Sequence, residues 1–468
     1  MLVNRAARLL LAIAGAWSIA SCGGSGDVAP YGASSPVVPG SPPPVVAPGS
    51  PPPVVAPAKT VVQVTLTGVA GSGLVLENNG GDALAVPGDG TYAFPTSLPE
   101  GSAYSVSIRA QPSRPDQVCT VSGGSGVASG ATVTVALACT TLPRFAFVTS
   151  VSATRVFSVD DTTGALTGTA NSIPYGGIVA PSLSPDKNLL LVAGVIGNDV
   201  RGFFVNRSTG ALTEVPGSPF PTGGLQPQGT AFSPDGRFFW AANRASNTVT
   251  TFAVNSTSGA LTAVGSPTAT GNYPLAVAPS PDGKFLYVAN YLGNSVSAYS
   301  VDAVTGALTA RFELPVGSPV RWIVIDPTNK FLYVSWGTNA LKGYAIDSTS
   351  GALTSVPGAP FIAGSTAQNM DIDPSGKWLY VTNETDATVS AFSINSASGD
   401  LAATGAPLGT GGLPEGVKVH PNGKFVYVAS QSTNAISIAS VNPATGALTA
   451  ATTAPMGGTP IDLAIMPD

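Results

Sequence analysis

Apolar and polar residues alternate with a period of two between residues 60 and 142, which is typical of half-buried β-strands. Turn signals such as Asn78-Asn79-Gly80-Gly81 and Asp89-Gly90 separate the runs. The number and spacing of the runs favour an immunoglobulin-like β-sandwich over residues 60–142. Its seven short strands are predicted near residues 61–67, 73–76, 83–86, 91–94, 103–110, 117–121 and 131–139.

The same alternation places two cysteines on the inner face of this sandwich. Cys139 shares a strand face with Val135 and Leu137, and Cys119 shares one with Val121. An exported protein can keep such a pair oxidised, so we predict one disulfide between Cys119 and Cys139. Nothing in this domain has catalytic spacing, which favours a spacer or adhesion-type role.

From residue 143 the sequence repeats seven times. A Gly-Ala-Leu-Thr element, strict or loose, recurs every 45 to 49 residues, with its glycine at positions 164, 210, 259, 306, 351, 399 and 446. A proline before a polar turn recurs at Pro185, Pro234, Pro281, Pro327, Pro374, Pro421 and Pro467, and six of these precede an apolar strand. Periods in the forties with about four strands per unit predict a seven-bladed β-propeller over residues 143–468.

The phase of the repeat predicts how the ring closes. The chain stops at Pro467-Asp468, where the apolar strand of the next repeat is due, and that strand stands instead at residues 145–149. The strand at 461–466 should therefore be the innermost strand of a blade whose other strands come from residues 145–168. Such interleaving removes a free sheet edge.

The N-terminal segment predicts export. Residues 1–21 combine Arg5 and Arg8 with a short apolar run, as in a signal peptide, and Ile19-Ala20-Ser21-Cys22 resembles a lipobox. That resemblance implies lipidation of Cys22, and Gly23 after it implies the outer membrane; ordinary secretion with a free Cys22 is the alternative. Residues 22–58 are then a lipidated N-terminus and a proline-rich, polyproline II tether.

Composition excludes several classes of function. The net charge of −5, with only 10% charged residues, offers no basic surface for nucleic acid. One histidine and three cysteines leave little material for a metal site or a Cys/His nucleophile, so we predict neither a metal nor a cofactor. The 55 glycines and 42 prolines argue against long helices, which agrees with an all-β protein.

The repeats resemble a known family. Tyr380-Val381-Thr382-Asn383 is the YVTN signature, and the Ser-Pro-Asp-Gly and Thr-Gly-Ala-Leu-Thr elements are similar to those of the lactonase-family propellers. That family includes proteins similar to 6-phosphogluconolactonase and carboxymuconate-cyclising enzymes. The resemblance implies a hydrolase with His, Arg and Glu at the channel mouth.

The residues depart from that enzyme pattern. The single histidine, His420, occupies a turn position that holds Ser or Asp in other repeats, which predicts a structural hydrogen bond. Trp336 replaces the Asn usual at a strand end and is expected to pack against a loop. No clustered cations for a phosphate are present, and a phosphorylated sugar lactone is a cytosolic compound, whereas this chain is predicted to be exported.

Aligning the innermost strands on the repeat proline identifies the candidate site. Six and five residues before that proline, polar side chains come from consecutive blades and should share one arc of a channel mouth, whereas Val179 and Leu275 make the opposite arc apolar. A mouth of mixed polarity suits a small ligand. The alternative is structural: Arg321 and Glu415 satisfy nearby loops, and Asp371 pairs with Lys418. The candidate ligand-binding residues are Gln228, Arg321, Gln368, Asn369, Glu415 and Asp462.

The sequence therefore leaves two functions open. The favoured one is a membrane-anchored binding module at the cell envelope, whose partner is an unknown protein, glycan or small molecule and whose membrane contact is the Cys22 lipid alone. The alternative is a lactonase-type hydrolase that acts on a non-phosphorylated lactone in the channel mouth. No motif in the sequence identifies catalytic residues for such a hydrolase.

Overall fold

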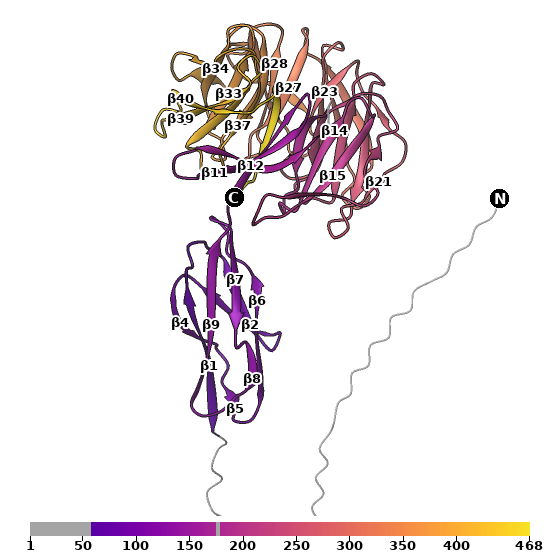
Figure 1. Ribbon diagram of the computed structural model, residues 1–468. Helices are drawn as coiled ribbons and strands as arrows, with labels where there is room; N and C mark the ends of the chain where they lie inside the picture. The colour runs from indigo at the N-terminus through magenta and orange to yellow at the C-terminus, as the bar shows by residue number, and fades with distance from the viewer. Residues whose placement is uncertain (1–57, 175–177) are drawn as a thin grey trace, which may run out of the picture. The chain divides into compact units, whose positions relative to one another are not determined.

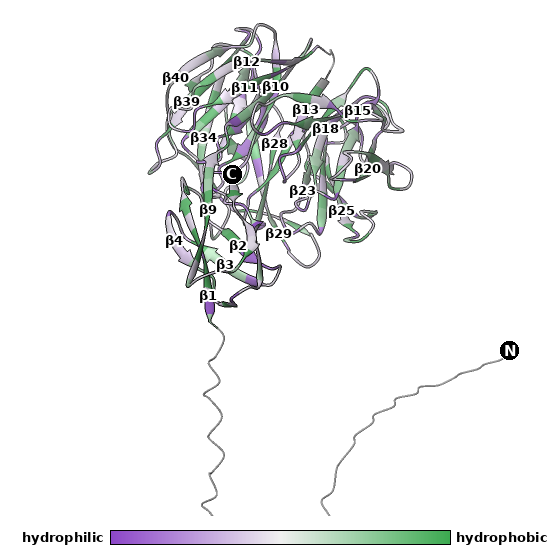
Figure 2. Ribbon diagram, turned by 60° about the horizontal axis from the view of Figure 1, so that its bottom comes forward, coloured by the Kyte–Doolittle hydropathy of each residue, from purple (hydrophilic) through white to green (hydrophobic). Residues whose placement is uncertain are grey.

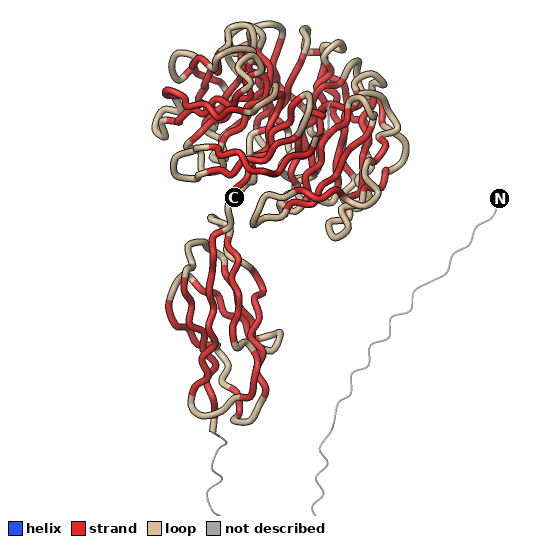
Figure 3. Tube along the Cα trace, in the orientation of Figure 1, coloured by secondary structure: helices blue, strands red, loops and turns tan. Residues whose placement is uncertain are grey.

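The computed structural model describes residues 58–174 and 178–468, and within these ranges all regular structure is β-strand (Figure 3). The predicted signal peptide, the Cys22 lipidation site and nearly all of the tether lie outside the described residues. No described helix has the length and apolar character needed to cross a membrane. The prediction of an all-β chain with a β-sandwich followed by a seven-bladed propeller is confirmed.

Two facing sheets form the sandwich. One contains β4 (Gly90–Ala93), β1 (Lys59–Thr67), β9 (Thr132–Thr141) and β7 (Gln117–Ser122), with β5 (Leu98–Pro99) against β1. The other contains β3 (Asp82–Val86), β2 (Leu74–Asn78), β6 (Ala103–Ala110) and β8 (Ser125–Val127). The strands β5 and β8 are absent from the sequence prediction because segments of two and three residues are too short to show an alternating pattern.

The core of the sandwich contains the predicted disulfide. Cys119 and Cys139 are directly opposite each other on the antiparallel pair β7–β9, with their Cα atoms 3.9 Å apart, and they are bonded. Cys119 is buried among Val64, Leu76 and Leu137, and Cys139 packs against the same cluster. The alternation that placed both side chains on the inner face is therefore correct.

Removing this bond should destabilise the sandwich. The double substitution Cys119→Ala and Cys139→Ala opens a loop spanning 20 residues, and the chain-entropy estimate for such a loop is about 3 kcal/mol. Urea unfolding of the oxidised protein and of the variant measures the difference. An unchanged midpoint for the sandwich transition would show that the bond contributes no stability.

The propeller contains seven antiparallel blade sheets (Figure 1). In each blade, the strand that is given first below is the innermost one. Blade 2 is β13 (Ile178–Leu183), β14 (Leu189–Gly194), β15 (Asp199–Val205), β16 (Leu212–Glu214) and β17 (Phe220–Pro221). Blade 3 is β18 (Pro227–Phe232), β19 (Phe238–Asn243), β20 (Thr248–Val254), β21 (Leu261–Ala263) and β22 (Thr268–Ala269). Blade 4 is β23 (Pro274–Pro279), β24 (Phe285–Asn290), β25 (Ser295–Val301) and β26 (Leu308–Pro315).

The remaining blades follow the same plan. Blade 5 is β27 (Val320–Ile325), β28 (Phe331–Trp336), β29 (Ala340–Ile346), β30 (Leu353–Ser355) and β31 (Phe361–Ile362). Blade 6 is β32 (Ala367–Ile372), β33 (Trp378–Asn383), β34 (Thr388–Ile394), β35 (Leu401–Ala403) and β36 (Leu408–Gly409). Blade 7 is β37 (Pro414–Val419), β38 (Phe425–Ser430), β39 (Ala435–Val441) and β40 (Leu448–Pro455).

Blade 1 combines the two ends of the repeat array. Its innermost strand β41 (Pro460–Ile465) pairs antiparallel with β10 (Arg144–Ser150), followed by β11 (Thr154–Val159) and β12 (Leu166–Ile173). This is the closure that the phase of the repeat predicts, with the strand starting one residue earlier. Arg144 is 9% exposed and joins the two ends: its guanidinium donates to the Met466 carbonyl and to the carboxylates of Asp161 and Asp468.

The hydrophobic core of the propeller lies between adjacent blades. Buried clusters join blade 1 to blade 2, through Phe147 and Val192, and blade 7 to blade 1, through Tyr427 and Leu463. In Figure 2 the blade strands carry much of the hydrophobic colour. The stability of each blade therefore depends on its neighbours.

The two sequence markers of the repeat meet at these contacts. The buried tyrosine of the second strand donates its hydroxyl hydrogen bond to the carbonyl of the Gly-Ala-Leu-Thr glycine in the next blade; Tyr427 does so to Gly164 at 2.9 Å across the ring closure. That glycine has a positive φ of 73°, and a Cβ there would lie 2.5 Å from the Phe425 ring. The motifs are therefore structural. The other pairs are Tyr287 with Gly351, Tyr333 with Gly399 and Tyr380 with Gly446.

Candidate functional site

A β-bulge at the start of each innermost strand shapes the channel mouth. In blades 5, 6 and 7 the pairing with the second strand shifts between Val320 and Ile323, between Ala367 and Met370, and between Pro414 and Val417. A bulge leaves residues outside the regular ladder and redirects their side chains. Both residues within each bulge can therefore face the channel, instead of one facing each side of the blade.

These bulges surround one pocket of about 150 Å³. All six candidate residues predicted from the repeat alignment line it, so the structure brings them together; whether they bind a ligand stays a prediction. Val179, Leu275 and Ile461 supply apolar surface. The complete lining is Val179, Ala180, Gln228, Leu275, Arg321, Trp322, Gln368, Asn369, Glu415, Gly416, Ile461 and Asp462.

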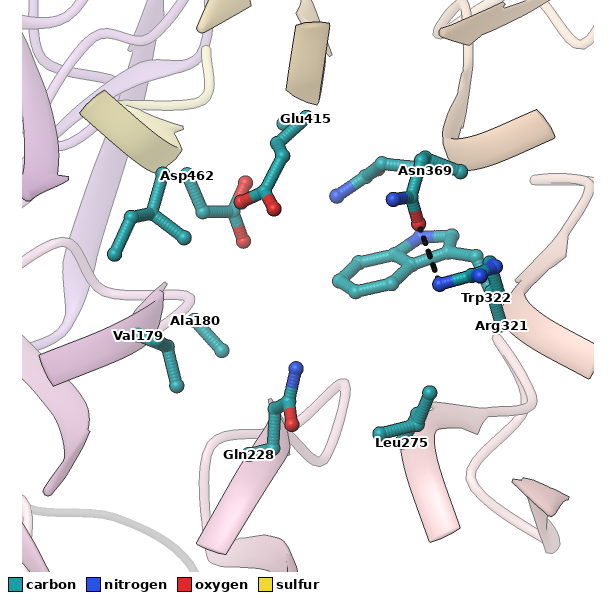
Figure 4. Close-up of a pocket in the computed structure, with 12 residues that line it drawn as sticks. Val179, Ala180, Gln228, Leu275, Arg321, Trp322, Asn369, Glu415 and Asp462 are labelled. Atoms are coloured by element: carbon teal, nitrogen blue, oxygen red, sulfur yellow. Dashed lines mark hydrogen bonds between the residues drawn. The ribbon is translucent and has the colours of Figure 1, made fainter. Parts of the chain in front are cut away.

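Two carboxylates lie next to each other on one side of the pocket. Glu415 of blade 7 and Asp462 of blade 1 both point inward, and Trp322 and Arg321 of blade 5 lie on the other side (Figure 4). Gly416 makes this arrangement possible, because a Cβ at that position would lie 2.4 Å from the Asp462 Oδ1 atom. Any larger residue there would displace the Asp462 carboxylate.

Burial changes the protonation of this pair. It raises the pKa of Glu415 from 4.5 to about 7, further raised by the charge of Asp462 and opposed by a hydrogen bond from Gln431. Burial also raises the pKa of Asp462 from 3.8 to about 6, opposed by the positive charge of Lys418. Near neutral pH the pair can therefore hold one proton, as a general acid next to a general base does.

Lys418 lies three residues after Glu415 on β37, deeper in the channel. Its Nζ atom is 3.5 Å from the Asp371 Oδ1 atom, which makes the expected ion pair between blades 6 and 7. Trp322 contributes both to the mouth pocket and to a second cavity that contains this ion pair. Trp322 therefore borders both cavities.

The other side of the pocket offers hydrogen-bonding groups. Arg321 Nη1 lies 3.5 Å from Gln368 Oε1, and its guanidinium carbon is 4.9 Å from the centre of the Tyr291 ring. Asn369 is 6% exposed, and its Oδ1 atom has no hydrogen-bond partner in the structure. A buried acceptor without a partner is costly, which makes Asn369 a candidate acceptor for a ligand hydroxyl.

Hydroxyl groups on the second strands hold the bulges in place, and the sequence analysis did not identify them. Ser335 Oγ accepts from the backbone N–H groups of Arg321 and Trp322 at 3.2 and 2.9 Å. Thr382 Oγ1 donates to the Glu415 carbonyl at 2.8 Å, and Thr149 Oγ1 donates to the Asp462 carbonyl at 3.1 Å. The sequence does distinguish these hydroxyl residues, because the equivalent positions in blades 2, 3, 4 and 7 are alanines.

A second tier of side chains lies around the pocket. The sequence analysis did not identify these residues either. Each follows the second strand directly, after the last position of the signature, which holds Asn in three of these blades and Ser430 in blade 7. Arg244 Nη1 donates to Gln228 Oε1 at 2.6 Å, and Gln368 Nε2 donates to Glu384 Oε2 at 2.5 Å. This position varies between repeats, and that variation is the signal that could have revealed it. The tier consists of Arg244, Tyr291, Glu384 and Gln431.

The two residues that were expected to be structural, His420 and Trp336, make their contacts away from the pocket. His420 is fully buried; its Nε2 lies 3.0 Å from Asp161 Oδ1, and its Nδ1 accepts from the Asn422 N–H. Trp336 Nε1 donates to the Val316 carbonyl at 2.8 Å. Over residues 58–174 and 178–468 no group of three or more His, Cys, Asp or Glu side chains is placed to hold a metal ion.

The fold and the site define a seven-bladed β-propeller with a polar pocket at one channel mouth. A family model described as lactonase, 7-bladed beta-propeller, matches residues 184–324 and 322–468. This is more than half of the sequence, and the chain belongs to that family.

Solved structures agree on the fold. A candidate 6-phosphogluconolactonase from Bacteroides uniformis ATCC 8492 is 20% identical with a TM-score of 0.62, over 69% of this chain and 99% of that chain. The periplasmic gluconolactonase of Pseudomonas aeruginosa is 20% identical with a TM-score of 0.59, over the same shares. Likeness at these identities concerns the fold. No curated protein matches the sequence.

Proposed function

We propose that this protein hydrolyses a small, non-phosphorylated sugar lactone in the mouth pocket. The observation that carries the proposal is the pair of buried carboxylates, Glu415 and Asp462, across the pocket from Arg321 (Figure 4). Membership of the lactonase family supports it. The sequence analysis placed a binding module first and the hydrolase second; the pairing of two carboxylates with raised pKa values reverses that order.

The pocket has the groups that opening a lactone requires. Asp462, with the lower pKa of the pair, takes a proton from a water molecule as the water oxygen adds to the lactone carbonyl carbon. Arg321 faces the pocket and can stabilise the negative charge that develops on the carbonyl oxygen. The bond between the carbonyl carbon and the ring oxygen then breaks, and protonated Glu415 gives its proton to that oxygen. The product is the open-chain hydroxy acid.

Size and charge restrict the substrate. A cavity of about 150 Å³ resembles in volume an engineered cavity that holds benzene, so one six-membered ring fits. Arg321 is the sole cation among the twelve lining residues, and it faces two carboxylates. A phosphate group would be repelled there, which favours a neutral lactone. The face of Trp322 offers apolar surface for the ring carbons.

The predicted export signal suggests where the proposed hydrolase acts. We propose that the hydrolase is anchored to the cell envelope through the Cys22 lipid and held away from the membrane by the tether. A neutral lactone outside the cytoplasm is compatible with that location. Binding of a protein or glycan partner stays the second candidate function, and a pocket that binds lactones without turning them over would favour it.

Hydrolysis can be measured directly. The mature full-length protein should accelerate the opening of glucono-δ-lactone, followed as acid release in a pH-stat at about pH 6.5, between the two carboxyl pKa values. We expect a lower kcat/KM for the 6-phosphorylated lactone. Hydrolysis no faster than the spontaneous reaction for a panel of neutral lactones would contradict the proposed function.

A further inference from the structure

Two tyrosine side chains with an arginine at each end form a row along the rim of the mouth pocket, beside blades 3 to 5. Arg244 lies with its guanidinium carbon 5.6 Å from the Tyr273 ring centre, the Tyr273 and Tyr291 rings are 6.2 Å apart, and Arg321 lies 4.9 Å from the Tyr291 ring centre. We call these four residues the rim strip. Arg321 belongs to both the strip and the pocket lining, so the two surfaces are continuous.

The rim strip is held in one conformation by its own contacts. The Tyr291 N–H donates to the Tyr273 carbonyl at 2.9 Å, and the Tyr273 N–H donates to Asn247 Oδ1 at 2.8 Å. Arg244 donates from Nε to Gln226 Oε1 at 3.1 Å and from Nη1 to Gln228 Oε1 at 2.6 Å. A surface fixed before binding loses little conformational entropy when a ligand arrives.

Neither arginine of the rim strip makes an ion pair. Among the described residues, no carboxylate lies within 4.0 Å of the guanidinium of Arg244 or Arg321, and their hydrogen-bond partners are amide and hydroxyl oxygens. The contrast is Arg237, which also stacks on an aromatic ring but pairs with Asp235 at 2.6 Å. A guanidinium without a carboxylate partner suits an incoming carboxylate, which it can bind through two parallel hydrogen bonds.

Two exposed leucines lie close in sequence to residues of the strip or to their partners. Leu225 and Leu292 are each 53% exposed, next in sequence to Gln226 and Tyr291. Tyrosine rings and exposed leucines accept the flat C–H faces of sugar rings, and the separations along the strip are comparable to the width of one such ring. Flat apolar surface combined with two guanidinium groups that have no carboxylate partner fits sugar units that carry carboxylates.

We propose that the rim strip is an outer subsite for uronate sugar units, so that the substrate is a lactone extended by an acidic oligosaccharide. The lactone ring would occupy the mouth pocket, and the uronate units would lie along Tyr291, Tyr273 and Arg244. The identity of the group in the pocket rests on the proposed function. The binding of uronate units to the strip does not, because it requires no turnover.

Titration calorimetry on the mature full-length protein tests the subsite. Trigalacturonate is the probe, and cellotriose is the neutral trisaccharide for comparison. We expect binding of trigalacturonate that weakens as salt increases, and little binding of cellotriose. The Arg244→Gln variant should bind trigalacturonate about tenfold more weakly, because one charge-assisted contact is lost. Arg237→Gln is the matched control and should bind like the wild type.

A second variant covers the case in which Arg244→Gln does not fold. Tyr273→Ala removes a central ring of the strip and should also reduce the affinity. The proposal fails if the wild type does not bind trigalacturonate, if it binds cellotriose equally well, or if Arg237→Gln weakens binding as much as Arg244→Gln. Glucono-δ-lactone hydrolysis is measured on the same wild-type sample, and its absence would contradict the proposed function without changing the titration result.

Discussion

Replacing Asp462 by Asn should reduce kcat for glucono-δ-lactone by about 10²- to 10⁴-fold, the range typical for loss of a general base. Asn keeps the size of the side chain and cannot accept the proton of the attacking water. Because Gly416 leaves space for this side chain and Thr149 holds its backbone carbonyl, the variant should fold like the wild type. Initial rates in the pH-stat measure the loss.

The pH profile separates the two carboxylates. For the wild type, kcat/KM should fall below about pH 6 as Asp462 becomes protonated and above about pH 7 as Glu415 loses its proton. Glu415→Gln should lower the rate and remove the alkaline limb. Asp282→Asn, in a polar turn at the far end of its blade, is the control. A profile whose alkaline limb persists in Glu415→Gln would exclude Glu415 as the acid.

The raised pKa of Glu415 also makes the free energy of unfolding depend on pH. A carboxyl group that binds its proton more tightly when folded makes the folded state take up protons first, so the free energy of unfolding falls as pH rises from about 4.5 to about 7. Glu415→Gln removes this contribution. Unfolding measured across that pH window should therefore depend less on pH in the variant than in the wild type.

Replacing Arg144 by Met should destabilise the propeller by about 2–4 kcal/mol, because hydrogen bonds to two carboxylates and to the Met466 carbonyl are lost together. Methionine keeps most of the side-chain volume, so the effect isolates the lost polar contacts. The midpoint of urea unfolding, followed by tryptophan fluorescence, measures it.

Arg237→Met provides the comparison for this closure contact. Its ion pair with Asp235 is surface exposed, with side-chain exposures of 56% and 47%, so it should cost less than about 1 kcal/mol. If Arg144→Met unfolds at the same urea concentration as Arg237→Met, the closure does not depend on this arginine.

The repeat made most of the fold and the pocket lining predictable from sequence. Counting back from the proline of each turn finds equivalent positions in every blade, and this placed Arg321, Glu415 and Asp462 at one mouth. Counting cannot show which way a bulged residue turns or how far a carboxylate is buried. The raised pKa values of Glu415 and Asp462, which changed the order of the two candidate functions, depend on that burial.

Contacts between residues of different repeats were harder to predict. The histidine turn was correctly expected to be structural, but nothing in the sequence indicates that His420 contacts Asp161, which is 259 residues away. Arg244 and Tyr291 of the rim strip were not predicted for a related reason. They lie just after a strongly patterned strand, at a position where the residue type differs between repeats, so an alignment of the repeats gives no shared residue to recognise. Their partners, Gln228 and Arg321, belong to other strands of the mouth.

The pairing of β41 with β10 has a consequence for how the protein is made. The innermost strand of blade 1 is the last blade strand to leave the ribosome, so the other three strands of that blade wait for it through the synthesis of six blades. Until then the edge of β10 stays unpaired, and Arg144 lacks the Met466 carbonyl. An exposed edge of this kind invites aggregation. Chains interrupted before β41 are therefore open rings, and a chaperone or protease can distinguish them from completed molecules by the unpaired inner edge of β10.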